Sequence, residues 1–417
     1  MLAPAGTRGD VEPMIALARV LRGRGHDVVL SASPSFAGLA ADHEIPFCPS
    51  GMDMQTWLGG SAHDVTRPRL RNVRAALGML SSTVEAQFRA LAQVCDGADL
   101  LVGAGLQFAG ASIAEALGLR YRFVAYTPQS FESTMHAPPV LPWVLPSATN
   151  RVAWFAWRRF VDVTLLAFVN RERHALGLGP LRELWRRSTA LADPLLACDR
   201  DLFGAPIDAP PGLVQTGAWH LPTAQTLGPD LEAFLQAGEA PVYVGFGSMP
   251  DSDPARTTQL VLDALRIVGR RVVLARGWAG LGAARHVGRE AHIVDAAPHD
   301  ALFARVAVAV HHGGAGTTAA AARAGIPQII VPHLGDQRAW GDRVRALGVG
   351  PSPILRASLT TARLVSRLQI ALEDPAMSER ARALAGRLHS GSGVDDAAAL
   401  ILKHLDRDST RNRSITA

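Results

Sequence analysis

The chain has 417 residues, of which 48% are hydrophobic and 19% are charged, a balance that is typical of a globular protein and excludes a disordered one. This length is enough for two domains that each bury a core of their own. The net charge of +5 comes from 42 basic and 37 acidic residues, but the basic ones are scattered rather than clustered, which argues against nucleic-acid binding.

Neither a membrane span nor a secretion signal is predicted. No apolar run reaches the roughly 18 residues that a membrane span needs, and the first residues lack the basic-then-apolar pattern of a signal peptide. The cysteines Cys48, Cys95 and Cys198 lie far apart, and such a sparse, odd-numbered set indicates reduced thiols rather than disulfides or a zinc site. We therefore expect a cytoplasmic protein.

The first half of the sequence alternates short apolar runs with helical patterns. The turn Gly6–Asp10 precedes a helical pattern over Val11–Arg24, which has Pro13 in its first turn and Gly25 as its stop. Such alternation predicts a parallel sheet with helices on both faces. The strands expected next are Asp27–Ser31, Asp99–Gly103 and Tyr121–Ala125, with a helix over Phe108–Leu117.

The middle of the chain has a different composition. Residues 128–157 are rich in Pro, Trp and Phe, and Arg151–Arg173 has the pattern of a long helix. Two interpretations fit this aromatic insertion equally: a lid or wall for an acceptor molecule, and a core helix behind a Pro-rich loop. The Pro- and Gly-rich sequence over residues 204–241 contains no strong strand, so we interpret it as the connection between two domains.

The second half resumes the alternation of strands and helices. The run Pro241–Ser248 is a strand that ends in small residues. The same strand–helix rhythm as in the first half indicates a second domain with its own parallel sheet. The further strands expected are Arg271–Ala275, His292–Asp295 and Val306–His311, and the last helices expected are Thr360–Leu372, Met377–Leu388 and Val394–Leu405.

The most informative segment is residues 311–337. The sequence HHGGAGTT at residues 311–318 follows an apolar strand directly. A strand, a glycine-rich turn and a helix start present free backbone N–H groups to an anion, and the helix dipole favours negative charge there. A second strand, Gln328–Pro332, then leads to Asp336 and Gln337, whose carboxylate and amide suit sugar hydroxyls. A phosphate-binding turn followed by side chains suited to sugar hydroxyls predicts a nucleotide-sugar site.

Two side chains are candidates for additional phosphate contacts. His311 comes directly after the strand, so its ring is expected to reach the bound anion, whereas His312 is expected to point the other way, into the core. The turn Gly245–Met249 also ends a strand in small residues, and the Ser248 hydroxyl is available there. Any turn between a strand and a helix has this composition, so Ser248 alone is a weak signal.

The sequence Asp251-Ser252-Asp253 resembles the acid-x-acid pair that binds a divalent metal on a sugar nucleotide. Here the pair precedes Pro254 and a helical pattern, where Asp is an ordinary N-cap residue. We therefore expect a helix cap and no metal, because the helix dipole and free N–H groups already offset the charge of a diphosphate.

Two residues are candidates for acid–base chemistry. Asp10 follows the first strand, and at that strand's carboxyl end it would face a cleft and take a proton from an acceptor hydroxyl. The alternative is that Asp10 only caps the following helix, and the sequence favours neither. His136 is the second candidate, as a base or an acceptor contact, and its alternative is an ordinary loop histidine.

Four stretches of the sequence together resemble the inverting family 1 glycosyltransferases of the GT-B fold, above all the sterol-type and glycopeptide-antibiotic glucosyltransferases. The stretches are residues 6–13, 245–249, 295–303 and 311–318, the last continuing to residues 335–343. The resemblance implies an α/β fold with two Rossmann-like domains that face each other across a cleft. It assigns residues 1–215 to an N-terminal acceptor-binding domain, 216–240 to an interdomain linker, 241–393 to a C-terminal nucleotide-sugar-binding domain, 394–405 to a helix that packs back on the first domain, and 406–417 to a flexible tail.

The resemblance also implies roles for individual residues. Asp10 matches the aspartate that acts as general base, and Val294 matches the position whose backbone contacts the pyrimidine, with Arg276 and Trp278 nearby. The expected diphosphate contacts are Ser248, His311, Gly313, Gly316 and Thr317, the expected sugar contacts are Asp336 and Gln337, and the expected acceptor contacts are Thr7, His136 and Trp143.

The expected function is inverting transfer of a hexose, with glucose from UDP-glucose as the donor, to a hydroxyl of a lipophilic natural product or sterol-like acceptor held near residues 143–168. The alternatives are a dTDP-deoxysugar transferase in bacterial antibiotic biosynthesis, a catalytically silent partner protein of the same fold, and a GT-B epimerase or phosphorylase. No cofactor, metal or nucleic acid is expected, and membrane contact is at most peripheral, in a monomer or homodimer. One departure stands out, since only five residues precede Gly6, so either the first strand is short or Met1 is a misassigned start.

Overall fold

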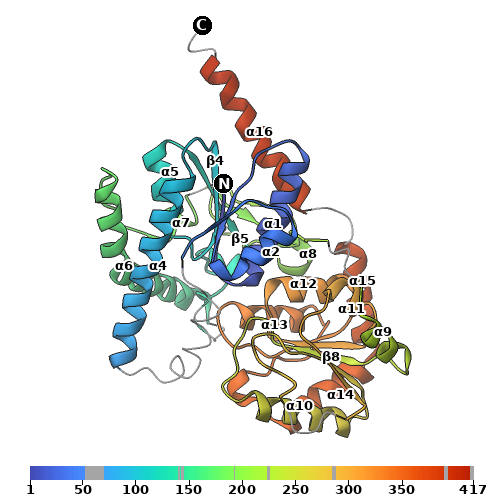
Figure 1. The fold of residues 1–417 in the computed structure, drawn as a ribbon. Coiled ribbons are helices and arrows are strands. Elements are labelled where there is room, and N and C mark those ends of the chain that lie inside the picture. The colour runs from blue at the N-terminus through green and yellow to red at the C-terminus, as the bar shows by residue number, and fades with distance from the viewer. Residues whose placement is uncertain are drawn as a thin grey trace.

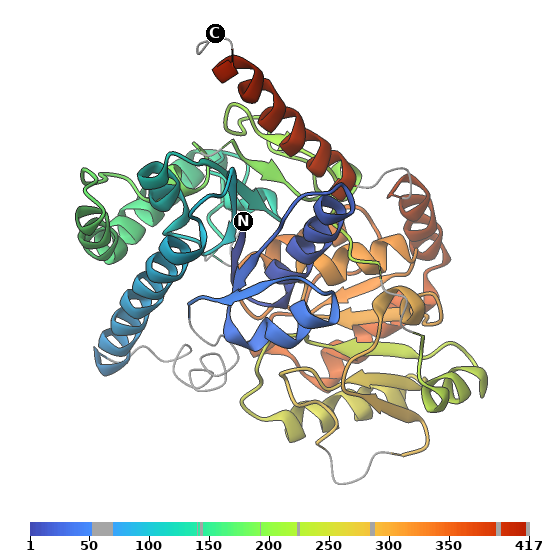
Figure 2. The ribbon, with the colours of Figure 1, turned by 45° about the horizontal axis from the view of Figure 1, so that its top comes forward.

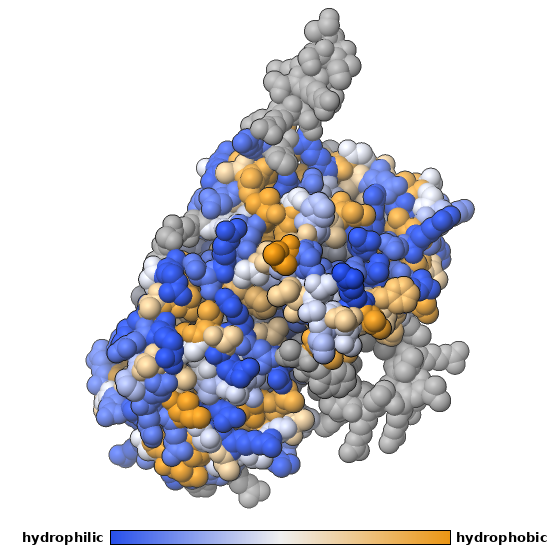
Figure 3. All heavy atoms as spheres, turned by 180° about the vertical axis from the view of Figure 1, so that it is seen from behind, coloured by the Kyte–Doolittle hydropathy of each residue, from blue (hydrophilic) through white to orange (hydrophobic). Residues whose placement is uncertain are grey.

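The computed structural model describes residues 1–51, 70–139, 141, 145–191, 193–222, 226–283, 288–388 and 393–413. Two parallel β-sheets, each flanked by helices, lie in two α/β domains that stand against each other (Figure 1). The predicted fold class is confirmed. On the face seen from behind, hydrophobic side chains are interspersed with hydrophilic ones (Figure 3).

The N-terminal sheet has seven strands in the order β3-β2-β1-β4-β5-β6-β7, and all its pairings are parallel. Although β1 has only four residues, it lies inside this sheet between β2 and β4 and pairs with β4 along its whole length, from Leu2 opposite Val102 to Ala5 opposite Gly105. The short first strand therefore still anchors the turn that follows it. The strands are β1 Leu2–Ala5, β2 Leu30–Ala32, β3 Phe47–Pro49, β4 Leu100–Gly105, β5 Arg120–Ala125, β6 Leu195–Leu196 and β7 Val214–Gln215.

The first helix, α1 (Arg8–Gly23), begins three residues earlier than the sequence predicted. Thr7 is its N-cap residue, and Asp10 is its third residue rather than a cap. The reason is a capping box, in which an acidic side chain at the third helical position accepts a hydrogen bond from the backbone of the cap residue. The other helices of this domain are α2 Ala37–Asp42, α4 Leu70–Val94, α5 Gly110–Leu117, α6 Ser147–Ala175, α7 Trp185–Ser188 and α8 Arg200–Phe203, with short 3-10 turns at Pro34–Phe36 and Pro128–Ser130.

Helix α6 lies beside α4 on the outer side of the N-terminal domain (Figures 1 and 2). One face of α6 is core, where Trp154, Val161 and Leu165 pack with Phe88 and Leu91 of α4. The interpretation of this segment as a core helix therefore holds for its inner face, while its outer face is exposed.

The C-terminal sheet has five parallel strands in the order β10-β9-β8-β11-β12. Part of the predicted linker belongs to this domain, because helix α9 (Pro229–Gln236) buries Leu231 and Leu235 against Tyr243 of the sheet. The strands are β8 Val242–Gly245, β9 Val272–Ala275, β10 Ala291–Val294, β11 Val308–His311 and β12 Gln328–Ile330. The helices are α10 Pro254–Ile267, α11 His299–Phe303, α12 Ala315–Arg323, α13 Gln337–Ala346, α14 Thr361–Glu373 and α15 Pro375–Leu388, with a 3-10 turn at Arg356–Ser358.

The last helix, α16 (Gly393–Arg413), returns to the N-terminal domain and packs on α1 (Figures 1 and 2). Val394, Ala397 and Ile401 join the core of that domain. The helix continues well past Leu405, where a flexible tail was expected, because no Gly or Pro interrupts residues 394–413. Within the described residues, no helix is long and apolar enough to cross a membrane.

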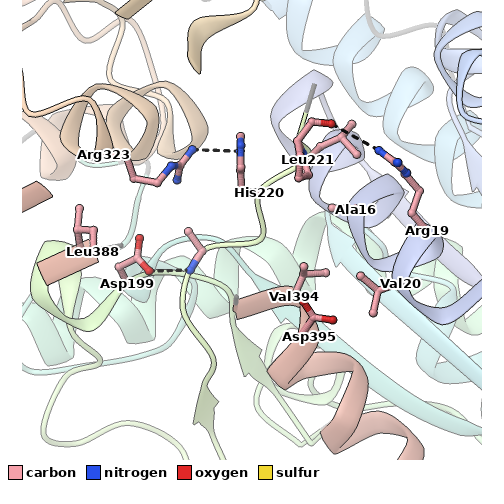
Figure 4. Close-up of a pocket in the computed structure, with 12 residues that line it drawn as sticks. Ala16, Arg19, Val20, Asp199, His220, Leu221, Arg323, Leu388, Val394 and Asp395 are labelled. Carbon is pink, nitrogen blue, oxygen red and sulfur yellow. Dashed lines mark hydrogen bonds between the residues drawn. The ribbon is translucent and has the colours of Figure 1, made fainter. Parts of the chain in front are cut away.

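The chain passes between the two domains at two places, near Gly217 and near Gly393, and these two segments are in contact. An added Cβ at Gly393 would lie only 2.5 Å from the carbonyl carbon of Gly217, so the two backbones are in direct contact. Next to them, His220 Nε2 lies 2.7 Å from Asp300 Oδ2, and Arg323 lies 3.1 Å from the other ring nitrogen of His220. A cavity of about 530 Å³ lies beside these two connecting segments and is lined by residues of both domains (Figure 4).

An apolar contact also joins the domains on the side of α13. Leu202 and Phe131 of the N-terminal domain share a cluster with Trp340 of α13. The rings of Phe203 and Trp340 meet edge to face at 5.2 Å, and Arg343 donates a hydrogen bond of 2.6 Å to the Leu202 carbonyl. These contacts bring the carboxyl ends of the two sheets together.

Candidate active site

The Asp10 carboxylate is held between two glycine turns at the carboxyl ends of β1 and β4. An added Cβ would lie 2.1 Å from Asp10 Oδ2 at Gly6 and 3.0 Å from Asp10 Oδ1 at Gly105, so only glycine leaves room for this side chain. The backbone N–H of Thr7 donates a hydrogen bond of 2.7 Å to Oδ2. One carboxylate oxygen is therefore fixed by the capping box, and Oδ1 is left for other chemistry.

The surroundings of Asp10 favour its protonated form more than water does. Burial raises the pKa of Asp10 to about 7, the hydrogen bond from Thr7 opposes this, and the negative charge of Asp336 raises it further. Tyr126, just after β5, donates a hydrogen bond of 3.0 Å to the Asp10 carbonyl. A carboxylate that titrates near neutral pH is suited to general-base catalysis.

Asp336 belongs to the other domain, where it is the N-cap residue of α13, and it lies close enough to Asp10 for its charge to raise the pKa of Asp10. Its Oδ2 accepts a hydrogen bond of 2.9 Å from the Trp340 indole, and the Thr127 side chain of the N-terminal domain also hydrogen bonds to the carboxylate. Burial raises the pKa of Asp336 to about 6, against these hydrogen bonds. Two partly buried carboxylates, one from each domain, thus lie near each other where the two sheets end.

Two tight turns adjoin Asp336 in the C-terminal domain. Gly313, with φ of +90°, follows β11 and leads through Gly314 into α12, and Gly247, with φ of +57°, follows β8. Gly316, in the first turn of α12, is exposed, and an added Cβ there would meet no heavy atom within 4 Å, so this side of the first turn is open. An open helix N-terminus beside glycine turns is the arrangement that binds a phosphate.

Comparisons with known proteins agree with this geometry. Residues 1–135 match the glycosyltransferase family 28 N-terminal domain, and residues 259–393 match the C-terminal domain of erythromycin biosynthesis protein CIII-like proteins. The chain is 34% identical to the vancomycin aglycone glucosyltransferase of Amycolatopsis orientalis over 98% of both chains. It is 35% identical to the dTDP-epi-vancosaminyltransferase of the same organism, over 87% of this chain and 89% of that one. This chain is a GT-B glycosyltransferase.

A solved structure supports the fold of this glycosyltransferase. The kitacinnamycin glycotransferase superposes with a TM-score of 0.71 at 20% identity, covering 96% of this chain and 97% of that one. At this identity the likeness concerns the fold alone. It shows that the two α/β domains and their facing sheet edges form the GT-B architecture.

The two histidines of the glycine-rich turn lie the other way round from the prediction, with His311 in the core and His312 beside the turns. In the glycosyltransferase His311 is fully buried, with Nε2 3.0 Å from Gln328 Oε1 and Nδ1 accepting the Gly313 N–H at 3.1 Å. Both of its ring nitrogens are already paired within the protein, so His311 has no free ring nitrogen for the predicted contact with the anion. His311 belongs to a strand whose pairing continues to its last residue, which turns its side chain into the core.

His312 is the histidine that lies between the two turns. An added Cβ at Gly314 would lie 2.5 Å from its Nε2, and one at Gly247 would lie 2.9 Å from its Cε1. Its Nδ1 is buried without a hydrogen-bond partner. Burial lowers the pKa of His312 well below its usual range, so the ring is neutral and offers one N–H donor.

The residues expected around the diphosphate and the pyrimidine lie together. The Trp278 N–H donates a hydrogen bond of 2.9 Å to the Gly247 carbonyl, next to Ser248, and the Arg276 N–H donates one of 2.8 Å to the Val294 carbonyl. The Arg276 guanidinium is exposed and pairs with Asp295 at 2.8 Å. Thr317 lies beside Gly316 in the open first turn of α12, whereas its neighbour Thr318 is buried and bonds to Gly314.

Gln337 does not present its amide to the site. Its Oε1 accepts hydrogen bonds from the backbone N–H groups of His333 at 2.7 Å and Leu334 at 3.1 Å, and its Nε2 lies 3.1 Å from Met249 Sδ. The side chain is buried and its amide is paired within the protein, and its contact with the sugar stays a prediction. Gln337 instead shapes the loop that ends in Asp336, because buried backbone N–H groups there need an acceptor.

The predicted acceptor residues are only partly linked to Asp10. Thr7 contacts it directly, but the described contacts of His136 are with Ala137, Trp154 and the charge of Asp208, and none joins His136 to Asp10. Burial lowers the pKa of His136, and its Nε2 has no partner. His136 therefore packs as a loop histidine, and Trp143 lies outside the described residues.

Sequence reasoning missed the residues that hold this region in place. Asp208 accepts hydrogen bonds from the Ser133 hydroxyl at 2.5 Å and from Thr134 N and Oγ1 at 2.7 Å each. Burial alone would raise the pKa of Asp208, but these hydrogen bonds outweigh it and lower the pKa to about 2. Asp208, Tyr126 and Thr127 carry no motif, so only their contacts show their roles.

In the Asp251-Ser252-Asp253 sequence, the predicted helix cap is confirmed. Asp253 caps α10 by accepting the Arg256 N–H at 3.0 Å, and Asp251 pairs with Arg356 at 2.6 Å. Both carboxylates thus have protein partners. Among the residues that the structure describes, no group of three or more His, Cys, Asp or Glu is placed to hold a metal ion.

Proposed function

We propose that this glycosyltransferase moves a hexose, with glucose from UDP-glucose as the leading donor, to a hydroxyl of a lipophilic natural product or sterol-like acceptor, with inversion at the anomeric carbon. The observation that carries the proposal is the pair of carboxylates, one from each domain, that lie near each other where the two sheets end. Asp10 has one oxygen fixed by Thr7 and a pKa near neutrality. Asp336, from the donor-side domain, is oriented by Trp340.

In the proposed step, the acceptor hydroxyl gives its proton to Asp10 Oδ1 while its oxygen attacks C1 of the sugar. The bond between C1 and the diphosphate oxygen breaks, and the nucleoside diphosphate leaves with that electron pair. In this proposal the N–H groups at the start of α12 and the neutral His312 ring stabilise the charge that develops on the diphosphate. Asp336 holds a hydroxyl of the sugar, so that C1 points towards Asp10.

The test is a donor screen followed by an acceptor screen. Purified enzyme is incubated with UDP- and dTDP-sugars, and slow donor hydrolysis is measured. The preferred donor is then offered with hydroxylated lipids and polyketides, and glycosylated products are detected by mass spectrometry. Hydrolysis of UDP-glucose and a product heavier by one hexose support the proposal.

A dTDP-deoxysugar donor is the second candidate, since the identity to dTDP-epi-vancosaminyltransferase, 35% over 87% of this chain, is close to that to the glucosyltransferase, 34% over 98%. The same donor screen separates the two candidates, because only the preferred nucleotide sugar is expected to be hydrolysed at low concentration. Calorimetry with UDP and with dTDP tests the catalytically silent alternative. A protein that binds neither nucleotide contradicts both donor proposals.

A further inference from the structure

Trp340 of α13 makes two contacts of different kinds. Its side chain is only 1% exposed, and its ring meets the ring of Phe203 edge to face, with the ring centroids 5.2 Å apart. Its indole N–H donates a hydrogen bond of 2.9 Å to Asp336 Oδ2, one helical turn back in the chain. Phe203 belongs to α8 of the N-terminal domain, whereas Trp340 and Asp336 belong to the C-terminal domain. One side chain therefore connects a contact between the domains to a carboxylate of the site.

The hydrogen bond to Asp336 depends on the orientation of the indole ring. Only one atom of the ring, Nε1, carries a donor, so rotation of the Trp340 side chain would take the N–H away from the carboxylate. Close packing opposes such a rotation, because it holds a buried side chain in one rotamer. The apolar cluster that contains Trp340 has members from both domains, and those from the N-terminal domain include Phe131, Leu202 and Phe203. The N-terminal domain thus contributes to the packing that fixes this ring.

Helix α8 has a defined position against the C-terminal domain. Leu202 is fully buried, and its carbonyl accepts a hydrogen bond of 2.6 Å from Arg343 of α13. The same helix also contacts α15, and Asp201 pairs with Arg387 of α15 at 3.6 Å. Because α8 is held on these sides, the Phe203 ring has a set position relative to Trp340.

The other side-chain partner described for Asp336 also comes from the N-terminal domain. The Thr127 side chain hydrogen bonds to the Asp336 carboxylate, and Thr127 is buried at the start of the 3-10 turn that follows β5. The carboxylate therefore has one hydrogen bond that crosses between the domains directly. It has a second from a ring, that of Trp340, which packs across the same boundary.

We propose that Phe203 is a positioning residue for the donor sugar. Its ring keeps the Trp340 indole in the orientation that fixes Asp336, so sugar binding by the C-terminal domain depends on the contact with α8. The phosphate-binding turns after β8 and β11 lie on other elements, so loss of the Phe203 ring weakens binding of the sugar and spares binding of the nucleotide. The inference rests on the role of Asp336 in the proposed function, but on no particular acceptor.

The experiment measures the Kd of UDP-glucose and of UDP by calorimetry on the full chain, with dTDP-glucose and dTDP as a second pair. Phe203→Leu retains an apolar side chain but removes the aromatic ring. We expect it to raise the Kd of UDP-glucose by about 2- to 10-fold, as the loss of an aromatic pair does, and to leave the Kd of UDP unchanged. Phe203→Tyr retains the ring, so it should bind both ligands like the wild type.

A double-mutant cycle tests whether Phe203 acts through the indole N–H. Trp340→Phe retains an aromatic ring and removes the donor, so the Kd of UDP-glucose should rise by about 10-fold, as for a lost hydrogen bond to a charged group. If Phe203 acts through this bond, adding Phe203→Leu to Trp340→Phe should cause no further rise, whereas independent effects would add.

The matched control is Arg343→Met. It removes another contact between α8 and α13, the hydrogen bond to the Leu202 carbonyl, and leaves both aromatic rings unchanged. If sugar binding depended on the strength of this interface in general, Arg343→Met would lose it as Phe203→Leu does. We expect wild-type Kd values for both ligands. Thermal melts of every variant show whether the fold is intact.

Four results would overturn the inference. The first is an unchanged Kd of UDP-glucose in Phe203→Leu, and the second is an equal rise in the Kd of UDP, which would assign Phe203 to the nucleotide site or to the fold. The third is the same loss in Arg343→Met, and the fourth is an additive cycle. A wild type that glycosylates no lipophilic acceptor contradicts the proposed function instead, and it leaves these ratios of Kd values as they are.

Discussion

Asp10 and Asp336 are alike in position and different in partners. Each follows a strand at the carboxyl end of a parallel sheet, each lies at the start of a helix, and burial raises the pKa of each. Asp10 has Thr7 on one oxygen, whereas Asp336 is held by Trp340 from its own helix and by Thr127 from the opposite domain. A carboxylate held through one oxygen can still accept a proton, and one clamped between two partners is better suited to orienting a ligand.

The largest effect is expected for the substitution Asp10→Asn. The amide oxygen can still accept the Thr7 N–H, so the turn is preserved while the base is removed. We expect kcat to fall by about 10²- to 10⁴-fold, as a lost general base does, with UDP binding unchanged by calorimetry. Turnover close to that of the wild type would refute the assignment of Asp10.

Asp336→Asn should have the next largest effect. The Trp340 indole keeps an oxygen acceptor, but the charged acceptor for a sugar hydroxyl is lost. We expect kcat/KM for the nucleotide sugar to fall by about 10- to 100-fold, since hydrogen bonds to charged groups contribute about 1.5–3 kcal/mol. Binding of UDP without sugar serves as the control, and a matching loss there would place Asp336 on the nucleotide rather than the sugar.

The same contrast shows what the sequence can and cannot predict. The glycine turns, the helix cap at Asp253 and most of the strands follow local rules and were predicted, whereas β3, β6 and β7, of two or three residues each, were not. The sequence could not tell which of His311 and His312 points to the turn, because this depends on how far β11 keeps its pairing. Thr127 and Tyr126 were missed because their partners lie on other elements, far away in the chain.

Separate substitutions of the two histidines test which of them contacts the phosphate. His312→Gln removes the neutral ring between Gly247 and Gly314, and we expect the Kd for UDP to rise by about 10-fold through loss of one N–H donor to a phosphate. His311→Asn disturbs the buried bonds to Gln328 and Gly313, so it should lower Tm more than it weakens UDP binding. Calorimetry and thermal melts on both variants are the measurements, and the reverse ranking would restore His311 as the phosphate contact.

The smallest expected effect is the influence of the Asp336 charge on the pKa of Asp10. Because Asp10 acts unprotonated and its pKa is about 7, kcat/KM should fall about 10-fold per unit as pH drops below that value. Asp336 raises the pKa of Asp10, so Asp336→Asn should move this midpoint to lower pH by less than about one unit. The pH profile of the variant, at whatever lower activity it retains, measures this shift. A midpoint that stays in place would mean that the two charges are insulated when substrate is bound, and a midpoint that rises would mean that a different group titrates.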